Sequence, residues 1–529
     1  MARDQFDYII VGGGTAGCVL AGRLSEDPTV SICLIEAGDA DRHLALRIPA
    51  LTFMAHGGGR FLTRDLSEPE PALNERRLQW VHGRVLGGGS SVNGMIYTRG
   101  HSSDYDGWQC TGWSFRDVLP YFLRSECNER GSSVWHGTTG PVAVARGRSP
   151  LPLCDSFLEA AASAGHPVVD DLNADVSEGF GHFDHTIDNG VRSSSARAFL
   201  RRRRSNLIIR TRTIALHIVF EGRRAIGVAT LCDGKSDVLQ AAREVIVCAG
   251  ALNSPHLLMV SGVGPAAHLR DFRVPIIHDA PEVGLNVQNH LRYALNYTCA
   301  APVTAFQYRR PMPALAGGLS YIFRRSGFLA RTTMSTGGCF KTDPSMEVAD
   351  MKVSLFNGLM GSAGGRRGML PAEEGFMLVL HQGSPHSRGE IRLRSADPLQ
   401  RPAIYPRNLS DPRDLPVLLE GIKRIRELAA QAPLRRFGIE EVLASPAVQN
   451  AGAVEADVRA RSTNIYHDVG SCRMGMDAGS VVDHHLRVRG VEGLRIADAS
   501  IIPRLMNANT NAPVMMVAER AADLIRQAA

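Results

Sequence analysis

The sequence predicts an α/β protein in which a Rossmann-like domain is interleaved with a second domain built on a mostly antiparallel sheet. Three observations lead to this prediction. A buried strand pattern, a glycine-rich turn and a helical pattern follow one another near the N-terminus. The middle of the chain lacks such turns and alternates apolar with polar residues, as antiparallel strands do. At 529 residues, the chain is also too long for one ordinary hydrophobic core.

The N-terminal unit has the order required for dinucleotide binding. Residues 7–11 form the strand pattern, the turn carries Gly12, Gly14 and Gly17, and a helical pattern begins at Val19. The first glycine permits a tight turn, the second lets a pyrophosphate approach the backbone, and the third allows the helix to pack closely on the strand. The N-terminus of that helix then faces the phosphates.

An acidic residue completes this unit. A second strand, residues 31–35, ends at Glu36, which lies 24 positions beyond Gly12. A carboxylate at that distance accepts hydrogen bonds from ribose hydroxyls in dinucleotide-binding folds. The unit predicts a bound dinucleotide, although it does not distinguish FAD from NAD.

Composition excludes several other classes of protein. Basic residues exceed acidic ones by only six, and the one basic run, residues 201–204, has no interleaved aromatics, so a nucleic-acid partner is not expected. The ten cysteines show no zinc-binding spacing, and we expect no metal and mostly buried thiols in a reducing compartment. Neither a signal peptide nor a membrane span is visible. The expected location is the cytoplasm, with peripheral membrane attachment left open.

Five blocks in order resemble the glucose-methanol-choline (GMC) oxidoreductase family, of the bacterial alcohol or choline dehydrogenase or alcohol oxidase type. The blocks are residues 83–100, 250–265, 283–290, 466–475 and 509–513, and the resemblance runs from Asp7 to about Leu524. It implies an enzyme that binds FAD and oxidises an alcohol to the aldehyde by hydride transfer to flavin N5.

The block at 83–100 has physical features that suit a buried ligand loop. Its glycines and serines at 87–91 can present backbone N–H groups and hydroxyls to an anion, and apolar neighbours surround them. Asp498, which the resemblance places beside FAD, could also be a helix or turn cap. The residues that the glycine turn, Glu36 and the resemblance together place around FAD are Gly12, Gly14, Thr15, Ala16, Gly17, Glu36, Ala37, Arg84, Val85, Gly88, Gly89, Ser90, Asn93, Gly94, Met95, Ile96, Ala215, Ala249, Gly250, Asp498, Ala499, Asn511, Ala512 and Pro513.

Some GMC enzymes attach FAD covalently through a histidine in the first of these blocks. Val92 occupies that position here, and valine cannot form the bond. The sequence therefore predicts non-covalent FAD.

The resemblance places the catalytic pair at His467 and Asn511, 44 positions apart. Histidine suits the role of base because its free pKa is near neutrality, and an asparagine amide can donate to a developing alkoxide. Asn511 also has a structural interpretation as the cap of a helix with Pro513 in its first turn. Two departures from the family pattern are Asp468, which could raise the pKa of the histidine, and Asn289, where aspartate is frequent.

The predicted FAD-binding domain comprises residues 1–155, 190–298 and 462–529, and the substrate domain comprises 156–189 and 299–461. In the latter, residues 351–356 and 389–394 predict antiparallel strands with one solvated face, and 414–430 predict a helix. The stretch 357–365 is rich in glycine and predicts either a loop that gates the site or an ordinary surface connection. Candidate substrate contacts are Phe356, Asn357, His381 and Tyr466.

A neutral primary alcohol, benzylic or aliphatic, is the expected substrate, because the aromatic cage and carboxylate that choline calls for are not visible in a chain with 6% aromatic residues. The alternatives are a choline-type dehydrogenase, a non-oxidative GMC-fold enzyme such as a hydroxynitrile lyase or light-driven decarboxylase, and a flavin-binding protein without catalysis. The pair His467 and Asn511 argues against the decarboxylase more than against the lyase. The electron acceptor, O2 or a quinone or other electron-transfer partner, is left open.

Overall fold

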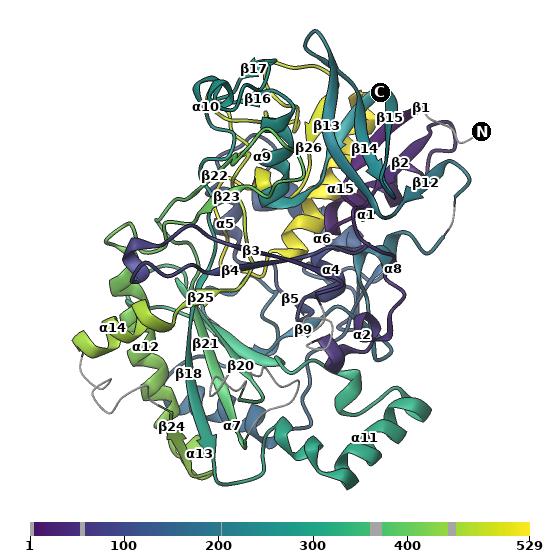
Figure 1. Cartoon of the computed structure of the whole chain (residues 1–529). Coiled ribbons are helices and arrows are strands. Elements are labelled where there is room, and N and C mark those ends of the chain that lie inside the picture. The colour runs from purple at the N-terminus through teal and green to yellow at the C-terminus, as the bar shows by residue number, and fades with distance from the viewer. Residues whose placement is uncertain (1–4, 53–58, 203, 360–372, 443–450, 529) are drawn as a thin grey trace.

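A computed structural model describes residues 5–52, 59–202, 204–359, 373–442 and 451–528. Two seven-stranded sheets dominate it, one in the upper and one in the lower half of the view in Figure 1. The α-helices span α1 Thr15–Leu24, α2 Leu44–Arg47, α4 Gly89–Val92, α5 Ser102–Asp106, α6 Phe115–Ser125, α7 Pro152–Ser163, α8 Ser195–Phe199, α9 Gly250–Val260, α10 Ala266–Asp271, α11 Pro311–Arg324, α12 Asp414–Ala429, α13 Ala432–Arg435, α14 Ala451–Arg461 and α15 Asn511–Ala528.

The first sheet is the predicted Rossmann-like one. Its parallel strands run in the order β12 (Leu207–Arg210), β2 (Ile32–Ile35), β1 (Gln5–Val11) and β15 (Lys235–Val247), with β26 (Leu494–Ile496) also parallel to β15. Strands β14 (Arg224–Cys232) and β13 (Thr213–Glu221) continue it antiparallel. Strand β2 and residues 8–11 of β1 are apolar and buried, as in strands that are covered on both faces.

Helices α1 and α15 bring the two ends of the chain together against this sheet. The buried stripe of α15 packs on α1 and α6. The helix that was predicted with Pro513 in its first turn is confirmed. Both helices begin at the carboxyl edge of the parallel strands, where ligands bind in open α/β sheets. Figure 1 shows α15 running from the centre of the molecule to this sheet.

The second sheet is antiparallel throughout, as predicted. Its order is β24 (Ile439–Glu441), β18 (Leu291–Cys299), β21 (Gly375–Gln382), β20 (Met351–Phe356), β19 (Thr336–Phe340) and β8 (Gly179–His182), and β25 (Thr463–Asn464) also pairs with β18. One face packs on α7 and α12 through a separate apolar cluster. The opposite face turns toward the first sheet.

Strand β20 corrects one expectation. The alternation in residues 351–356 predicted a solvated face, yet all six residues are buried, and Lys352 is only 1% exposed. The polar face lines the interior between the two sheets instead of facing bulk water. Strand β22 (Glu390–Arg392), from the other alternating stretch, pairs only with β23 (Ala403–Tyr405), in a hairpin of its own.

The remaining strands are short and connect the sheets. They are β3 Leu62–Leu66, β4 Gln79–Gly83, β5 Ile96–Tyr97, β6 Glu126–Asn128, β7 Val142–Val144, β9 Asp184–His185, β10 Ile187–Asp188, β11 Val191–Arg192, β16 Val263–Gly264 and β17 His278–Asp279. The second sheet includes residues 291–298 of β18 and residues 463–464, which lie within the ranges expected for the FAD-binding domain. The domain ranges themselves stay a prediction.

Seven of the ten cysteines are buried, as expected for small apolar residues. Among the helices of the described residues, none combines the length and the apolar character needed to cross a bilayer. The expected loop at 357–365 lies outside the described residues from position 360 onward.

Candidate active site

A cavity of about 1570 Å³ lies between the two sheets. This volume exceeds the roughly 300–1,000 Å³ typical of sites for one small ligand. The first sheet, the α4 loop and the start of α15 line one part of it. The inward face of the second sheet lines the other part, so the cavity can hold a dinucleotide and a second molecule together.

The glycine turn has the geometry expected of a phosphate cradle. Gly12 has φ +105°, and a Cβ on Gly17 would lie 1.9 Å from the Gly12 carbonyl oxygen, so the helix packs directly on the turn. A Cβ on Gly14 would meet nothing closer than 4.0 Å, because that side is open. The backbone at Gly14 is therefore accessible to a pyrophosphate.

Glu36 holds this turn to the end of β2. Its carboxylate accepts hydrogen bonds from the backbone N–H of Gly13 at 2.9 Å and of Gly38 at 2.7 Å. Burial raises the pKa of Glu36, and the two amides oppose that rise. Glu36 also lines the cavity, in the position predicted for a ribose contact.

The loop around α4 brings further backbone to the cavity. A Cβ on Gly89 would meet nothing within 4 Å, and Met95 is held at φ 65°, in the left-handed region that non-glycine residues rarely adopt. The carboxamide oxygen of Asn93 accepts a hydrogen bond from the buried guanidinium of Arg192 at 2.7 Å. Burial lowers the pKa of Arg192 to about 9, and this cation fixes the direction of the Asn93 amide.

Asp498 has the capping role that was one of its two interpretations. One carboxylate oxygen accepts from the backbone N–H and the hydroxyl of Ser500, and the other accepts from the N–H of Gly250 and the hydroxyl of Ser254. Burial raises the pKa of Asp498, and these donors oppose the rise. Asp498 also lines the cavity, so the two interpretations are compatible.

Most of the residues predicted around FAD lie on one surface. Those that line the cavity are Gly12, Gly14, Thr15, Ala16, Glu36, Ala37, Arg84, Gly88, Gly89, Asn93, Gly94, Met95, Ile96, Ala215, Ala249, Gly250, Asp498, Ala499 and Asn511. Val92, on which the prediction of non-covalent binding depends, lines it as well. The cavity lining does not include Gly17, Val85, Ser90, Ala512 and Pro513.

The reacting part of the cavity contains His467. Its backbone N–H donates to the Asn289 carboxamide at 2.9 Å, so the asparagine that departs from the family pattern positions the histidine. The preceding residue, Tyr466, has φ 65° and lines the cavity. Left-handed backbone at a bulky residue is uncommon and concentrates at functional sites.

A chain of hydrogen bonds orients the His467 ring. The Asn509 carboxamide oxygen accepts from Lys352 Nζ at 2.8 Å and from the Thr98 hydroxyl at 3.2 Å. Because an ammonium group can only donate, the Asn509 oxygen faces Lys352, and its Nδ2 donates to His467 Nε2 at 3.1 Å. Nε2 is therefore the unprotonated nitrogen of a neutral His467.

The chain continues on the other side of the ring. His467 Nδ1 lies 2.9 Å from His290 Nδ1, and His290 Nε2 lies 2.8 Å from the carbonyl oxygen of Gly383. Since a carbonyl can only accept, His290 carries its proton on Nε2 and accepts from His467 at Nδ1. This arrangement assigns one tautomer to each histidine.

The surroundings lower the pKa of His467 well below its ordinary value. Burial is the main cause, followed by the proximity of His290 and Lys352. Burial also lowers the pKa of His290 to about 3. His467 is therefore a neutral base near pH 7, and its basic electron pair, which accepts the Asn509 hydrogen bond, is at Nε2.

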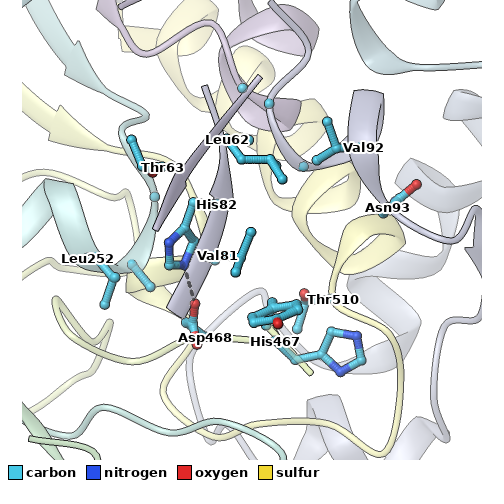
Figure 2. A pocket seen from close by; sticks show the side chains of 18 of the residues that line it. Leu62, Thr63, Val81, His82, Val92, Asn93, Leu252, His467, Asp468 and Thr510 are labelled. Atoms are coloured by element: carbon cyan, nitrogen blue, oxygen red, sulfur yellow. Dashed lines mark hydrogen bonds and ion pairs between the residues drawn. The ribbon is translucent and has the colours of Figure 1, made fainter. Parts of the chain in front are cut away.

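Asn511, the predicted partner of this histidine, lines the cavity, but its oxygen accepts from the Thr15 hydroxyl at 2.9 Å, which joins the starts of α15 and α1. The amide beside the base is that of Asn509. Asp468 does not raise the pKa of His467, because its carboxylate pairs with His82 Nε2 at 2.5 Å. Figure 2 shows His82 and Asp468 facing each other across the dashed line.

The second sheet supplies the wall opposite the nucleotide turn. In its register, Arg292, His381 and Lys352 are neighbours across three strands, followed by Ala294, Val379 and Ser354, and then by Asn296, Met377 and Phe356. His381 stacks on His290 with ring centroids 4.1 Å apart. Phe356 and Tyr466 also line the cavity, as predicted. Asn357 does not: it is 2% exposed and its oxygen accepts from the Cys154 thiol.

Nitrogen atoms of His290, His381 and His467 lie within 4.8 Å of one another, a spacing that could suit a metal ion. Both nitrogens of His290 and both of His467 already take part in the hydrogen bonds of the chain described above. A metal ion would have to displace those bonds. The sequence-based expectation of no metal stays a prediction.

Sequence reasoning missed four residues of this site: Asn509, His290, Lys352 and Arg192. His290 and Asn509 lie inside blocks that carried the family resemblance, so their polar side chains were a usable signal. Lys352 and Arg192 gave none, because a basic residue in a short alternating stretch is usually exposed.

Comparisons with known proteins identify the family of the chain. The sequence matches the GMC oxidoreductase N-terminal domain over residues 6–292 and the C-terminal domain over 385–518. It is 39% identical to the alcohol dehydrogenase [acceptor] of Pseudomonas putida over 98% of this chain and 96% of that protein, and 37% identical to the mitochondrial choline dehydrogenase of Homo sapiens over 99% and 90%.

Among solved structures, pyridoxine 4-oxidase from Mesorbium loti is 28% identical, with a TM-score of 0.88 and 99% of each chain covered. The predicted fold class, the flavin enzyme and the activity on alcohols are confirmed at the level of the family. The chain belongs to the GMC oxidoreductase family.

Proposed function

We propose that this GMC oxidoreductase oxidises a neutral primary alcohol, benzylic or aliphatic, to the aldehyde, with His467 as base and FAD bound non-covalently. The observation that carries the proposal is the unprotonated Nε2 of His467, held next to the Asn509 amide in the cavity. The same nitrogen and the same amide can converge on one substrate oxygen.

The cavity residues suit FAD. The open backbone at Gly14 and Gly89, the carboxylate of Glu36 and the start of α15 form a continuous lining between the sheets. Val92 occupies the place of the linking histidine, so the cofactor should be released by denaturation. When bound, FAD accepts the hydride that leaves the carbinol carbon.

His467 takes the hydroxyl proton in this proposal. Nε2 accepts it, and the imidazolium that forms keeps its Nδ1 hydrogen bond to His290, whose low pKa leaves that ring neutral. The Asn509 amide donates to the oxygen on which negative charge develops. Asn511 moves from a catalytic to a structural role, because it joins the two helix starts.

Lys352 acts as a positioning residue. Its ammonium group contacts Thr98 and Asn509 and lies over the Phe183 ring, 5.1 Å from the centroid. These contacts hold the Asn509 amide with its donor toward His467. Without Lys352, the amide could rotate, and Nε2 would lose its fixed partner.

The cavity lining favours a neutral substrate. Among the described lining residues, the carboxylates are Glu36, Asp468 and Asp498, and each is already hydrogen bonded to protein groups. On the side of the second sheet, the charged lining residues are Arg292 and Arg461. A trimethylammonium group would therefore meet Arg292 and Arg461, of which Arg461 is paired with Asp457. Its aromatic partners among the described lining residues, besides histidine, would be Phe356 and Tyr466.

Choline is the second candidate, because two of the similar proteins are the choline dehydrogenases of Homo sapiens and Paraburkholderia phymatum. The electron acceptor in the proposal is O2 or a quinone or other electron-transfer partner, and the proposed location is the cytoplasm.

Anaerobic mixing with a panel of primary alcohols tests the proposed function. We expect the yellow flavin absorbance to bleach with at least one neutral alcohol and to return with O2 or with a quinone, whichever is the acceptor. Failure of every alcohol to bleach the flavin, together with cleavage of a cyanohydrin, would establish a lyase and reject the proposal.

A further inference from the structure

Helix α11 (Pro311–Arg324) exposes an apolar face to solvent. Five large side chains project from it, with exposed fractions between 46% and 79%, and they are Met312, Leu315, Leu319, Ile322 and Phe323. We call these five side chains the α11 face. In Figure 1 the helix lies at the edge of the molecule, away from the labelled N and C ends.

The orientation of α11 is the reverse of that in an ordinary surface helix. Spacings of three and four residues place the five side chains on one stripe, which such a helix normally buries. Here the opposite side packs inward: Tyr321 is the buried residue, and its hydroxyl donates to the carbonyl oxygen of Gly190 at 3.1 Å. Tyr308 stacks on Phe328 beside it, with centroids 4.2 Å apart. Among the described residues, none therefore covers the apolar stripe.

The charge around this face is one-sided. Residues 300–342 contain no acid, and their six basic residues are Arg309, Arg310, Arg324, Arg325, Arg331 and Lys341. The whole chain has a formal net charge of +6, so this segment accounts for all of it. Two exposed arginines precede the helix and two stand at its end.

We propose that the α11 face docks on an anionic lipid bilayer surface. The apolar side chains enter the boundary between headgroups and acyl chains, and the arginines at both ends of the helix bind lipid phosphates, as in amphipathic helices that lie in the membrane plane. Contiguous apolar side chains rimmed by basic ones match this surface in both shape and charge.

A second copy of the chain is a poorer occupant. A twofold contact through the α11 face would bring the arginines of one copy against those of the other, with no acid in the segment to compensate. A bilayer containing anionic lipids supplies the opposite charge. The complementarity therefore points to lipid.

The docking surface adjoins the cavity wall. Met334, at the end of the same segment, lines the cavity, and the backbone N–H of Ala305 donates to the carbonyl oxygen of Asn357, next to the lining residue Phe356. Docking would place this side of the cavity near the membrane. Lipid-soluble substrates or quinones would then reach it from the bilayer, a consequence that rests on the proposed function, whereas docking itself does not.

Sedimentation with vesicles tests the inference on the full-length holoenzyme. We expect the protein to sediment with phosphatidylcholine vesicles that contain phosphatidylglycerol, to stay in solution with phosphatidylcholine alone, and to dissociate as salt is raised. Two double variants, Ile322→Ser with Phe323→Ser and Arg324→Glu with Arg325→Glu, should each weaken partitioning by about tenfold or more. Both should retain FAD and flavin reduction by alcohol.

Matched changes on the first sheet provide the control. Val238→Ser and Arg223→Glu alter an exposed apolar and an exposed basic residue and should leave vesicle binding unchanged. Absence of sedimentation with anionic vesicles would overturn the inference. Equal loss in the control variant would do so too, as would a dimer, seen by light scattering without lipid, that the α11 variants dissociate.

Discussion

The Asn509 amide donates to His467 Nε2 at 3.1 Å, and Asn511, two residues later, instead accepts from the Thr15 hydroxyl. The two asparagines therefore have different expected roles. Asn509→Ala should slow flavin reduction by about 10²-fold, since it removes a donor to the developing alkoxide and the partner that orients the base. Asn511→Ala is the matched control and should slow it far less. Anaerobic stopped-flow absorbance measures both, and the reverse order would return the catalytic role to Asn511.

Lys352 should influence the pH dependence of the reaction. The pKa of His467 is lowered by burial, by His290 and by Lys352, so the acidic limb of kcat/KM should lie well below pH 6.5. Lys352→Met removes one of these causes, and the limb should move to higher pH because protonated His467 becomes less unfavourable.

The groups that face Lys352 limit how this result can be explained. Burial lowers the pKa of Lys352, and the nearby Cys339 and Asp104 oppose that effect. The charge of Lys352 in turn lowers the pKa values of His290, His381 and His467. Lys352→Arg should retain a donor and a charge and so restore part of the wild-type limb. A lower kcat with an unmoved pH limb in Lys352→Met would show only a packing defect and would refute the electrostatic role.

The two arginines that line the cavity on the side of the second sheet, Arg292 and Arg461, predict discrimination against choline. The neutral isostere 3,3-dimethylbutan-1-ol has the shape of choline without its charge. Comparing kcat/KM for the two alcohols therefore measures the effect of that charge. We expect kcat/KM for the isostere to exceed that for choline by about tenfold or more. Arg292 and Arg461 line that side, Arg461 takes up the Asp457 carboxylate, and each carboxylate among the described lining residues is already hydrogen bonded to protein groups. A higher kcat/KM for choline would favour the second candidate function.

His136 predicts an alkaline loss of stability. Burial alone would lower its pKa, but hydrogen bonds to Asp171 and Glu126 raise it from 6.5 to about 9, with Arg99 opposing. A raised folded-state pKa gives stability that is fully present below pH 6.5 and is lost as the pH rises through about 9. His136→Gln should lower the free energy of unfolding at pH 6.5 and flatten its fall toward pH 9.

Urea unfolding across this pH range measures the effect. His217→Gln, at an exposed position, is the control and should keep the wild-type profile. An unchanged slope in His136→Gln would assign the alkaline loss to other groups.

Local order along the chain was sufficient to predict the nucleotide part of the fold. The glycine turn, β2 and Glu36 form one short unit whose geometry depends on neighbours in sequence, and the structure places its residues as expected. Antiparallel strands outside the first sheet were also predictable, because the stretches 351–356 and 389–394 alternate, although only the first of them joins the second sheet.

The details of the reacting site depend on contacts across the chain and could not be predicted in the same way. The alternation around Lys352 is the same for a strand facing water and for one facing a polar cavity, so its burial was missed. Asn509 and Asn511 are two positions apart in one block, and only the fold determines which amide meets His467, 42 residues away. Asp468 likewise pairs with His82, which sequence gave no reason to select.

The rate of flavin reduction in His467→Ala tests the central claim most directly. The variant should retain yellow, bound FAD, and anaerobic stopped-flow mixing with the best alcohol should show reduction slowed by about 10²- to 10⁴-fold, as expected for loss of a catalytic base. His256→Ala, a buried histidine of the cavity lining that the proposal does not use, is the control. A His467→Ala enzyme that binds FAD and reduces it at the wild-type rate would contradict the account.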